Sequence, residues 1–245
     1  MSGRDLFFRD ALAILVEKEM KPAVDQTLDW ESFMEPIWLS VKVSFIASLW
    51  VMLLGIWAAH RIGGRRFFGK TLLETVLMLP LVLPPTVVGF LLLMLLGRKG
   101  WIGRLWEWWF AQPVIFTWHA AVIAAVVVAF PLVYQTLKAG FASVPGVYKD
   151  AARLDGAGEW QVLLGITLPL AARSLATAYV LGFARSLGEF GATLMIAGNI
   201  PGRTQTISTA IYAAVESNRM GLAGLWSAVL ICIAFVLLLA ARARS

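Results

Sequence analysis

The sequence predicts an all-α, polytopic membrane protein, and three properties of the chain support this prediction. Of its 245 residues, 59% are hydrophobic and only 15% are charged, whereas about a quarter of the residues in a soluble domain are charged. The apolar residues form runs of about 20, the length that a helix needs to cross a bilayer. These runs are continuous and do not alternate with polar residues as the strands of a membrane barrel do, so we expect helices.

Five segments are long and apolar enough to be predicted spans. They are Ile37–Ala59, Leu72–Leu96, Val114–Tyr134, Leu170–Ala197 and Leu222–Ala241. Residues 1–36 are predicted to be an N-terminal extension, with an amphipathic or surface helix over residues 5–20, because the apolar residues there are too interrupted to span. The alternative is a short sixth span, which would reverse the N-terminus. Charges throughout residues 1–36 argue against a cleavable signal peptide.

The distribution of Lys and Arg predicts the orientation of the chain. Ten of these residues lie in the connections 60–71 and 135–169, at Arg173 and in the C-terminal tail, against five in 97–113 and 198–221. Because cytoplasmic connections are enriched in Lys and Arg, we expect a multi-pass protein of the cytoplasmic membrane with its C-terminus inside and its N-terminus outside. The cations lie between apolar spans, so the net charge of +6 does not indicate nucleic acid binding.

Residues typical of enzymes and of metal sites are scarce. Cys232 is the single cysteine and lies in an apolar run, and the two histidines, His60 and His119, are far apart in the sequence. We therefore predict no metal site, no bound cofactor and no catalytic residue. The chain also lacks the G-x-x-x-x-G-K-[ST] phosphate-binding loop, so any ATP that drives it is hydrolysed by another subunit.

A polar stretch between the third and fourth predicted spans carries the clearest motif. It has the order acid-Ala-Ala, three residues, Gly, nine residues and Ile-x-Leu-Pro, which falls on Asp150, Ala151, Ala152, Gly156, Ile166, Leu168 and Pro169. The glycine allows a turn between two short helices, and the proline suits the start of the next helix. The pattern resembles the EAA loop of ABC-importer permeases, in which Glu usually stands where this chain has Asp150; the alternative is an ordinary connection. We call Asp150–Pro169 the EAA-like motif.

Two further motifs lie within predicted spans. Arg185 and Glu189 are four residues apart, so they share a helix face, and charges at such depth normally face a bundle interior or water. They either hold helices together or belong to a gate or translocation path, for which the candidate residues are Arg185, Ser186, Gly188, Glu189, Gly191 and Thr193. Three prolines in the second span are predicted to break its helix, either as a pathway element or as a packing kink: Pro80, Pro84 and Pro85.

The segments Leu77–Gly89 and Ala184–Thr206 resemble those of the molybdate (and tungstate) permease subunits, and sulfate/thiosulfate permeases carry a less similar version. The resemblance implies the type I ABC-importer fold, with five core helices in a permease domain over 37–241 and a cytoplasmic coupling loop over 138–169. It implies a homodimer, a dimer of ATP-binding subunits that hold ATP and Mg, and an extracytoplasmic molybdate-binding protein. The expected function is molybdate import by alternating access; the alternatives are sulfate/thiosulfate or tungstate import, or a passive anion channel.

Overall fold

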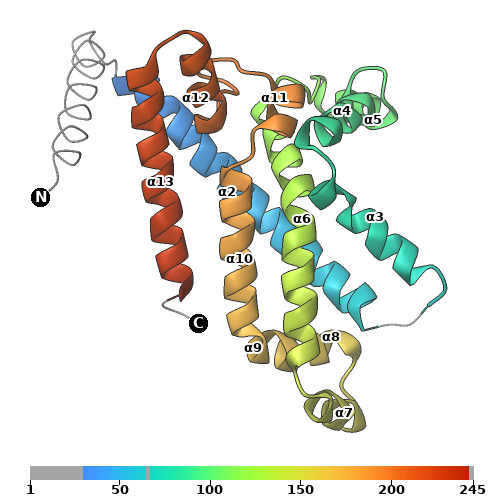
Figure 1. Ribbon diagram of the computed structural model, residues 1–245. Helices are drawn as coiled ribbons and strands as arrows, with labels where there is room; N and C mark the ends of the chain where they lie inside the picture. The colour runs from blue at the N-terminus through green and yellow to red at the C-terminus, as the bar shows by residue number, and fades with distance from the viewer. Residues whose placement is uncertain (1–29, 65–66, 243–245) are drawn as a thin grey trace, which may run out of the picture.

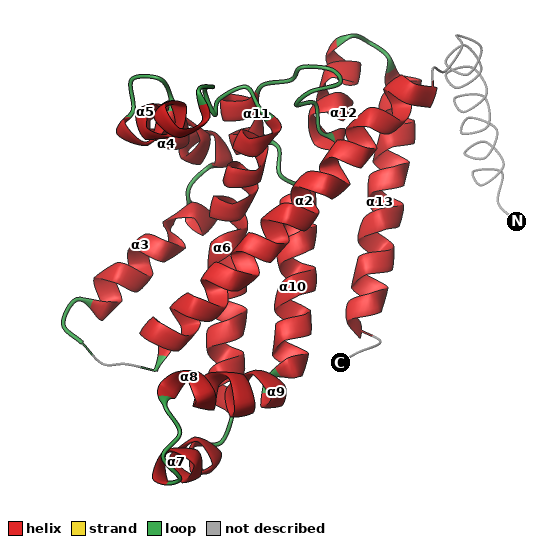
Figure 2. Cartoon of the chain, turned by 180° about the vertical axis from the view of Figure 1, so that it is seen from behind, coloured by secondary structure: helices red, strands yellow, loops and turns green. Residues whose placement is uncertain are grey.

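A computed structural model describes residues 30–64 and 67–242, and every regular element within them is helical (Figures 1 and 2). The expected surface helix over residues 5–20 lies outside these residues. In chain order the elements are α2 (Trp30–Ala58), the π-helical turn η1 (Ala59–Gly63), α3 (Lys70–Val82), α4 (Pro85–Leu96), α5 (Trp101–Phe110), α6 (Trp118–Ser143), α7 (Gly146–Leu154), α8 (Glu159–Val162), the π-helical turn η2 (Leu163–Thr167), α9 (Leu168–Leu170), α10 (Ala172–Leu187), α11 (Gly191–Ala197), α12 (Ile207–Glu216) and α13 (Met220–Arg242).

The all-α membrane fold is confirmed, but two of the five predicted spans are not single straight helices. Three helices are long and apolar enough to cross a bilayer unaided: Trp30–Gly63, Trp118–Ser143 and Met220–Leu239. Two helix pairs are long and apolar enough only when taken together, and both are bent, with an angle of 114° between α3 and α4 and of 80° between the segment α8–α9 and α10. The predicted fourth span, Leu170–Ala197, is therefore not one helix, because the chain bends before α10 and breaks again between α10 and α11.

Two predicted helix ends are wrong because polar residues continue a helix. The first span begins at Trp30 rather than Ile37, and the third continues to Ser143 rather than ending at Tyr134. The coupling loop was expected to begin at residue 138, yet Lys138 lies inside α6. Its ammonium group is paired with the Glu74 carboxylate of α3 at 2.7 Å, and this pairing offsets the cost of a charge in an apolar helix.

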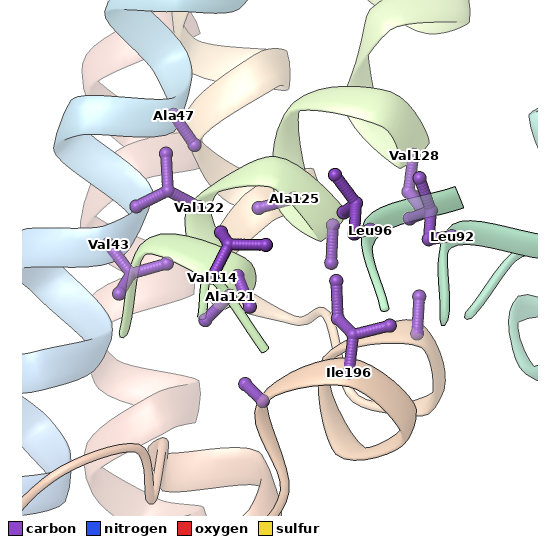
Figure 3. Packing of buried hydrophobic residues seen from close by; sticks show 14 of the residues in the cluster. Val43, Ala47, Leu92, Leu96, Val114, Ala121, Val122, Ala125, Val128 and Ile196 are labelled. Atoms are coloured by element: carbon purple, nitrogen blue, oxygen red, sulfur yellow. The ribbon is translucent and has the colours of Figure 1, made fainter. Parts of the chain in front are cut away.

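The core is formed by small side chains around α6. Figure 3 shows residues of α2, α4 and α11 packed around this helix, which contributes Ala121, Val122, Ala125 and Val128. A Cβ atom built on Gly182 of α10 would come within 2.7 Å of the Val133 side chain of α6. Such small residues let membrane helices approach closely, and α2, α3, α4, α10 and α11 all pack against α6.

Candidate functional site

The first half of the EAA-like motif lies in α7 and ends in a Schellman turn. Gly156 has φ +88°, the left-handed conformation that glycine adopts without steric cost. Its amide donates to the Arg153 carbonyl at 3.1 Å, and the Ala157 amide donates to the Ala152 carbonyl at 2.9 Å. These two bonds satisfy carbonyls at the end of α7. The three residues between the acid-Ala-Ala sequence and the glycine therefore place the glycine where α7 ends.

Hydrogen bonds from Arg153 link α7 to the start of α8. Its Nη1 donates to Asp150 Oδ1 at 2.8 Å, while Nε and Nη2 donate to the two carboxylate oxygens of Glu159 at 2.9 and 3.2 Å. These hydrogen bonds raise the pKa of the Arg153 guanidinium above its ordinary value. Nearby, Lys149 Nζ donates to the Phe141 carbonyl at 2.8 Å, and burial lowers the pKa of Lys149.

The second half of the motif joins this turn to the helix bundle. Leu163 is fully buried, and Leu168 packs against the same core cluster. Ile166 is half-buried and Pro169 is exposed in α9. Pro169 lies in the first turn of the short helix α9, and the chain bends before α10 begins at Ala172. The motif therefore has an exposed part that is covalently continuous with a buried anchor.

Helix α7 lies at one end of the bundle (Figure 1), and most of its residues are exposed. Asp150 and Ala151 are exposed and Ala152 is half-buried. Two large apolar side chains, Val147 and Leu154, are 76% and 89% exposed. Exposed apolar residues flanking small ones form a surface suited to a protein partner.

The two helix breaks lie against each other, although more than a hundred residues separate them in the sequence. A Cβ atom built on Gly191, the first residue of α11, would lie 2.9 Å from Pro85 Cβ, at the start of α4. One built on Gly89 would lie 2.9 Å from the Ala192 Cα. The glycines thus allow backbone contact between α4 and α11, which sequence reasoning did not predict.

The Arg185–Glu189 pair bridges the break between α10 and α11. Arg185 Nη1 donates to Glu189 Oε2 at 2.9 Å, and Glu189 Oε1 accepts from the Ala192 amide at 3.0 Å. The Glu189 side chain is 2% exposed and that of Arg185 31%. A buried carboxylate needs such partners. The pair therefore fixes the start of α11 relative to the end of α10.

The other candidate gate residues surround this pair. Gly188 is the C-cap of α10, while Ser186 and Thr193 are buried on either side of the break. Within the described part of the chain, the buried Ser186 Oγ has no hydrogen-bond partner. A role of these residues in a gate or a path stays a prediction.

The proline break lies at Leu83 and Pro84, and Pro85 is the first residue of α4. Leu83 and Pro84 both have extended backbones, as expected for residues that precede proline. Pro80 was also predicted to break the helix, and this prediction is wrong: Pro80 lies inside α3. Membrane helices tolerate such a proline because neighbouring groups satisfy the freed carbonyl.

Sequence reasoning missed one polar cluster, formed by Glu74 of α3 with Tyr134 and Lys138 of α6. Glu74 Oε1 accepts from Tyr134 Oη at 2.9 Å and from Lys138 Nζ at 2.7 Å. The sequence contained one indication of this cluster, because Glu74 is the only acidic residue in the predicted second span. An acid in such a segment is a candidate functional residue.

The bent helices and the exposed polar loop define a multi-pass transport subunit of the cell membrane. The chain belongs to the family described as "Binding-protein-dependent transport system inner membrane component", whose model matches residues 51–244.

Several known proteins are similar to this chain. It is 53% identical over 206 residues to the "Putative molybdenum transport system permease protein YvgM" of Bacillus subtilis (strain 168), covering 84% of this chain and 91% of that protein. It is 45% identical over 190 residues to the molybdenum transport system permease protein ModB of Escherichia coli (strain K12), covering 77% and 81%. The sulfate transport system permease protein CysW of Synechococcus elongatus is 35% identical over 71% of this chain and 60% of its own.

A solved structure shares the fold of this chain. A chain of a bacterial ABC transporter involved in the import of the acidic polysaccharide alginate superimposes with a TM-score of 0.68 at 18% identity, covering 98% of this chain and 93% of that one. At this identity the likeness concerns the fold alone. The expected ABC-importer permease fold is confirmed.

Proposed function

We propose that this chain is the membrane-spanning subunit of an ATP-driven importer that carries molybdate across the cytoplasmic membrane by alternating access. One observation carries the proposal: the EAA-like motif forms an exposed helix, α7, that is joined to buried anchors at the end of the bundle. This is the geometry that a motor protein needs in order to move membrane helices. The residues assigned to coupling are Asp150, Ala151, Ala152, Gly156, Ile166, Leu168 and Pro169.

The energy for transport comes from partner subunits. A dimer of ATP-binding subunits, holding ATP and Mg, docks on α7 of two copies of this chain. ATP closes the motor dimer and opens the path outward, and hydrolysis resets the inward-facing state. An extracytoplasmic molybdate-binding protein delivers the anion to the outer connections. The chain is oriented with α7 and the C-terminus in the cytoplasm and the N-terminus outside, in agreement with its Lys and Arg distribution.

The paired helix breaks form the proposed gate. Gly188 and Gly191 flank Glu189, and the Arg185–Glu189 pair ties α10 to α11 at 2.9 Å. Movement of α10 therefore reaches α11 and, through the Gly191–Pro85 contact, α4. Ser186 and Thr193 offer hydroxyl groups of the kind that bind an oxyanion weakly, and weak binding permits release.

Molybdate is proposed as the cargo because the molybdenum permeases of Bacillus subtilis and Escherichia coli are 53% and 45% identical to this chain, against 35% for the sulfate permease of Synechococcus elongatus. The alternatives within the class are tungstate and sulfate or thiosulfate, which are dianions of similar shape. A passive channel is the alternative from another class, and it would need no ATP.

Uptake of labelled molybdate by proteoliposomes that contain the complete transporter tests this proposal. We expect uptake to require ATP and the binding protein, and to persist in a large excess of sulfate. Competition by sulfate at equal concentration would contradict the molybdate assignment. Conduction of the anion by vesicles that contain this chain alone, without ATP, would contradict the importer mechanism.

A further inference from the structure

The cluster of Glu74, Tyr134 and Lys138 continues into a polar face shared by α3 and α6. Next to it on α6, Gln135 is exposed, and its Nε2 lies 3.1 Å from Met78 Sδ of α3. These residues come from helices whose other exposed side chains are largely apolar. We call Glu74, Gln135 and Lys138 the α3–α6 polar face; Tyr134 is buried beneath it.

The described part of this chain leaves this face partly uncovered. The side chains of Lys138 and Glu74 are 31% and 22% exposed, although they form an ion pair. On α3, Val76 lies two residues from Glu74, about 200° around the helix, and is 51% exposed and apolar. A charged pair open on one side needs water or protein next to it, whereas an apolar side chain can face lipid.

From this asymmetry we propose that the α3–α6 polar face lines the cytoplasmic part of the translocation path, with Lys138 as a transient contact for the tetrahedral dianion. The inference rests on the proposed function of the chain. Glu74 holds the ammonium group of Lys138 at 2.7 Å and neutralises it between transport events. A passing dianion competes with Glu74 for Lys138, so it is bound weakly and then released, as conduction through a charged path requires.

Cysteine labelling tests whether this face meets water. The chain has one cysteine, so Cys232→Ala gives a cysteine-free form of this subunit, which is the parent in the complete transporter in inside-out membrane vesicles; labelling is measured on this subunit alone. Gln135→Cys is expected to react with a charged, membrane-impermeant methanethiosulfonate. The same reagent should leave Val76→Cys, the matched position on the other face of α3, at least tenfold slower to react. ATP with vanadate, which traps the outward-facing state, should slow the Gln135→Cys reaction at least fivefold.

Transport kinetics test the role of Lys138 separately. Glu74→Gln leaves the ammonium group uncompensated, so both the KM for molybdate and the maximal rate should fall severalfold because release is slowed. Lys138→Gln should raise the KM, and the double variant should recover the maximal rate that Glu74→Gln loses. A purely structural ion pair would instead lower the amount of protein in the membrane and leave the KM unchanged.

The possible results separate this inference from the proposed function. If the cysteine-free parent imports molybdate but position 135 does not react, or reacts equally in both nucleotide states, the α3–α6 polar face meets lipid, protein or the membrane surface, and the inference is overturned. If the parent imports no molybdate while position 135 reacts in a nucleotide-dependent way, the aqueous face is supported and the cargo assignment fails. Equal labelling at positions 135 and 76 also overturns the inference.

Discussion

Replacing Glu189 by glutamine removes a buried charge and leaves the shape of the side chain nearly unchanged. The amide oxygen can still accept the hydrogen bond that Glu189 receives from the Ala192 amide at 3.0 Å. The charge attraction to Arg185 is lost. Two unit charges about 4 Å apart attract by about 4 kcal/mol at an effective dielectric constant of about 20. Since the Arg185 side chain is 31% exposed and gains hydration, we expect a net loss of roughly 3 kcal/mol.

The chain contains a matched control for this variant. Glu159 also accepts from an arginine at 2.9 Å, but its side chain is 50% exposed, whereas that of Glu189 is 2% exposed. An exposed pair contributes at most about 1 kcal/mol. For a protein of this size about 1 kcal/mol corresponds to about 2–4 °C in Tm. Glu189→Gln should therefore lower the Tm by about 6–12 °C, and Glu159→Gln by less than about 4 °C.

Thermal unfolding of the purified protein in detergent gives both Tm values, and molybdate uptake is then measured below both transitions. If the gate assignment is right, Glu189→Gln lowers uptake at a temperature at which the variant is folded, and Arg185→Ala does the same. Equal Tm shifts for the two glutamine variants would refute the argument from burial. A destabilised Glu189→Gln variant with normal uptake would assign the pair to packing alone.

Three further substitutions test other contacts. Gly156→Ala forces a side chain into a backbone with φ +88°, at a cost of about 1–2 kcal/mol. This variant should increase the ATP hydrolysed per molybdate imported. The control Gly165→Ala, whose added methyl group lies in open space at a position without a positive φ, should not. Gly191→Ala places a methyl group 2.9 Å from Pro85 Cβ and should lower stability by about 1–3 kcal/mol, measured as a Tm shift against Gly224→Ala. Trp226→Phe removes the indole hydrogen bond to the Phe33 carbonyl and should cost about 1 kcal/mol in the same assay.

The helices of this protein could be predicted from local sequence, but two of their ends could not. Continuous apolar runs are enough to indicate membrane helices, because the bilayer leaves few alternatives. The end of α6 was misplaced because Gln135 and Lys138 are polar, and their partners, Met78 and Glu74, lie on another helix. A sequence pattern carries no information on such a distant partner.

In the candidate site, too, some features could be predicted from the sequence and others could not. The turn at Gly156 follows from its spacing, since a helix that ends there needs a residue with positive φ. The bridge from Arg153 to Glu159 depends on how that turn returns the chain, and the contact between Gly191 and Pro85 depends on the packing of α11 against α4. Both are tertiary contacts, which the sequence alone does not indicate.

The 80° bend before α10 gives the chain the geometry of a lever. Helix α10 has 16 residues, so it is about 24 Å long, with η2 and α9 at one end and the Arg185–Glu189 pair at the other. A tilt of about 5° at the bend would move the far end by about 2 Å. That displacement is comparable to the difference between a hydrogen-bonded and a separated ion pair. A small rotation of η2 and α9 is therefore enough to make or break a contact at the far end of α10.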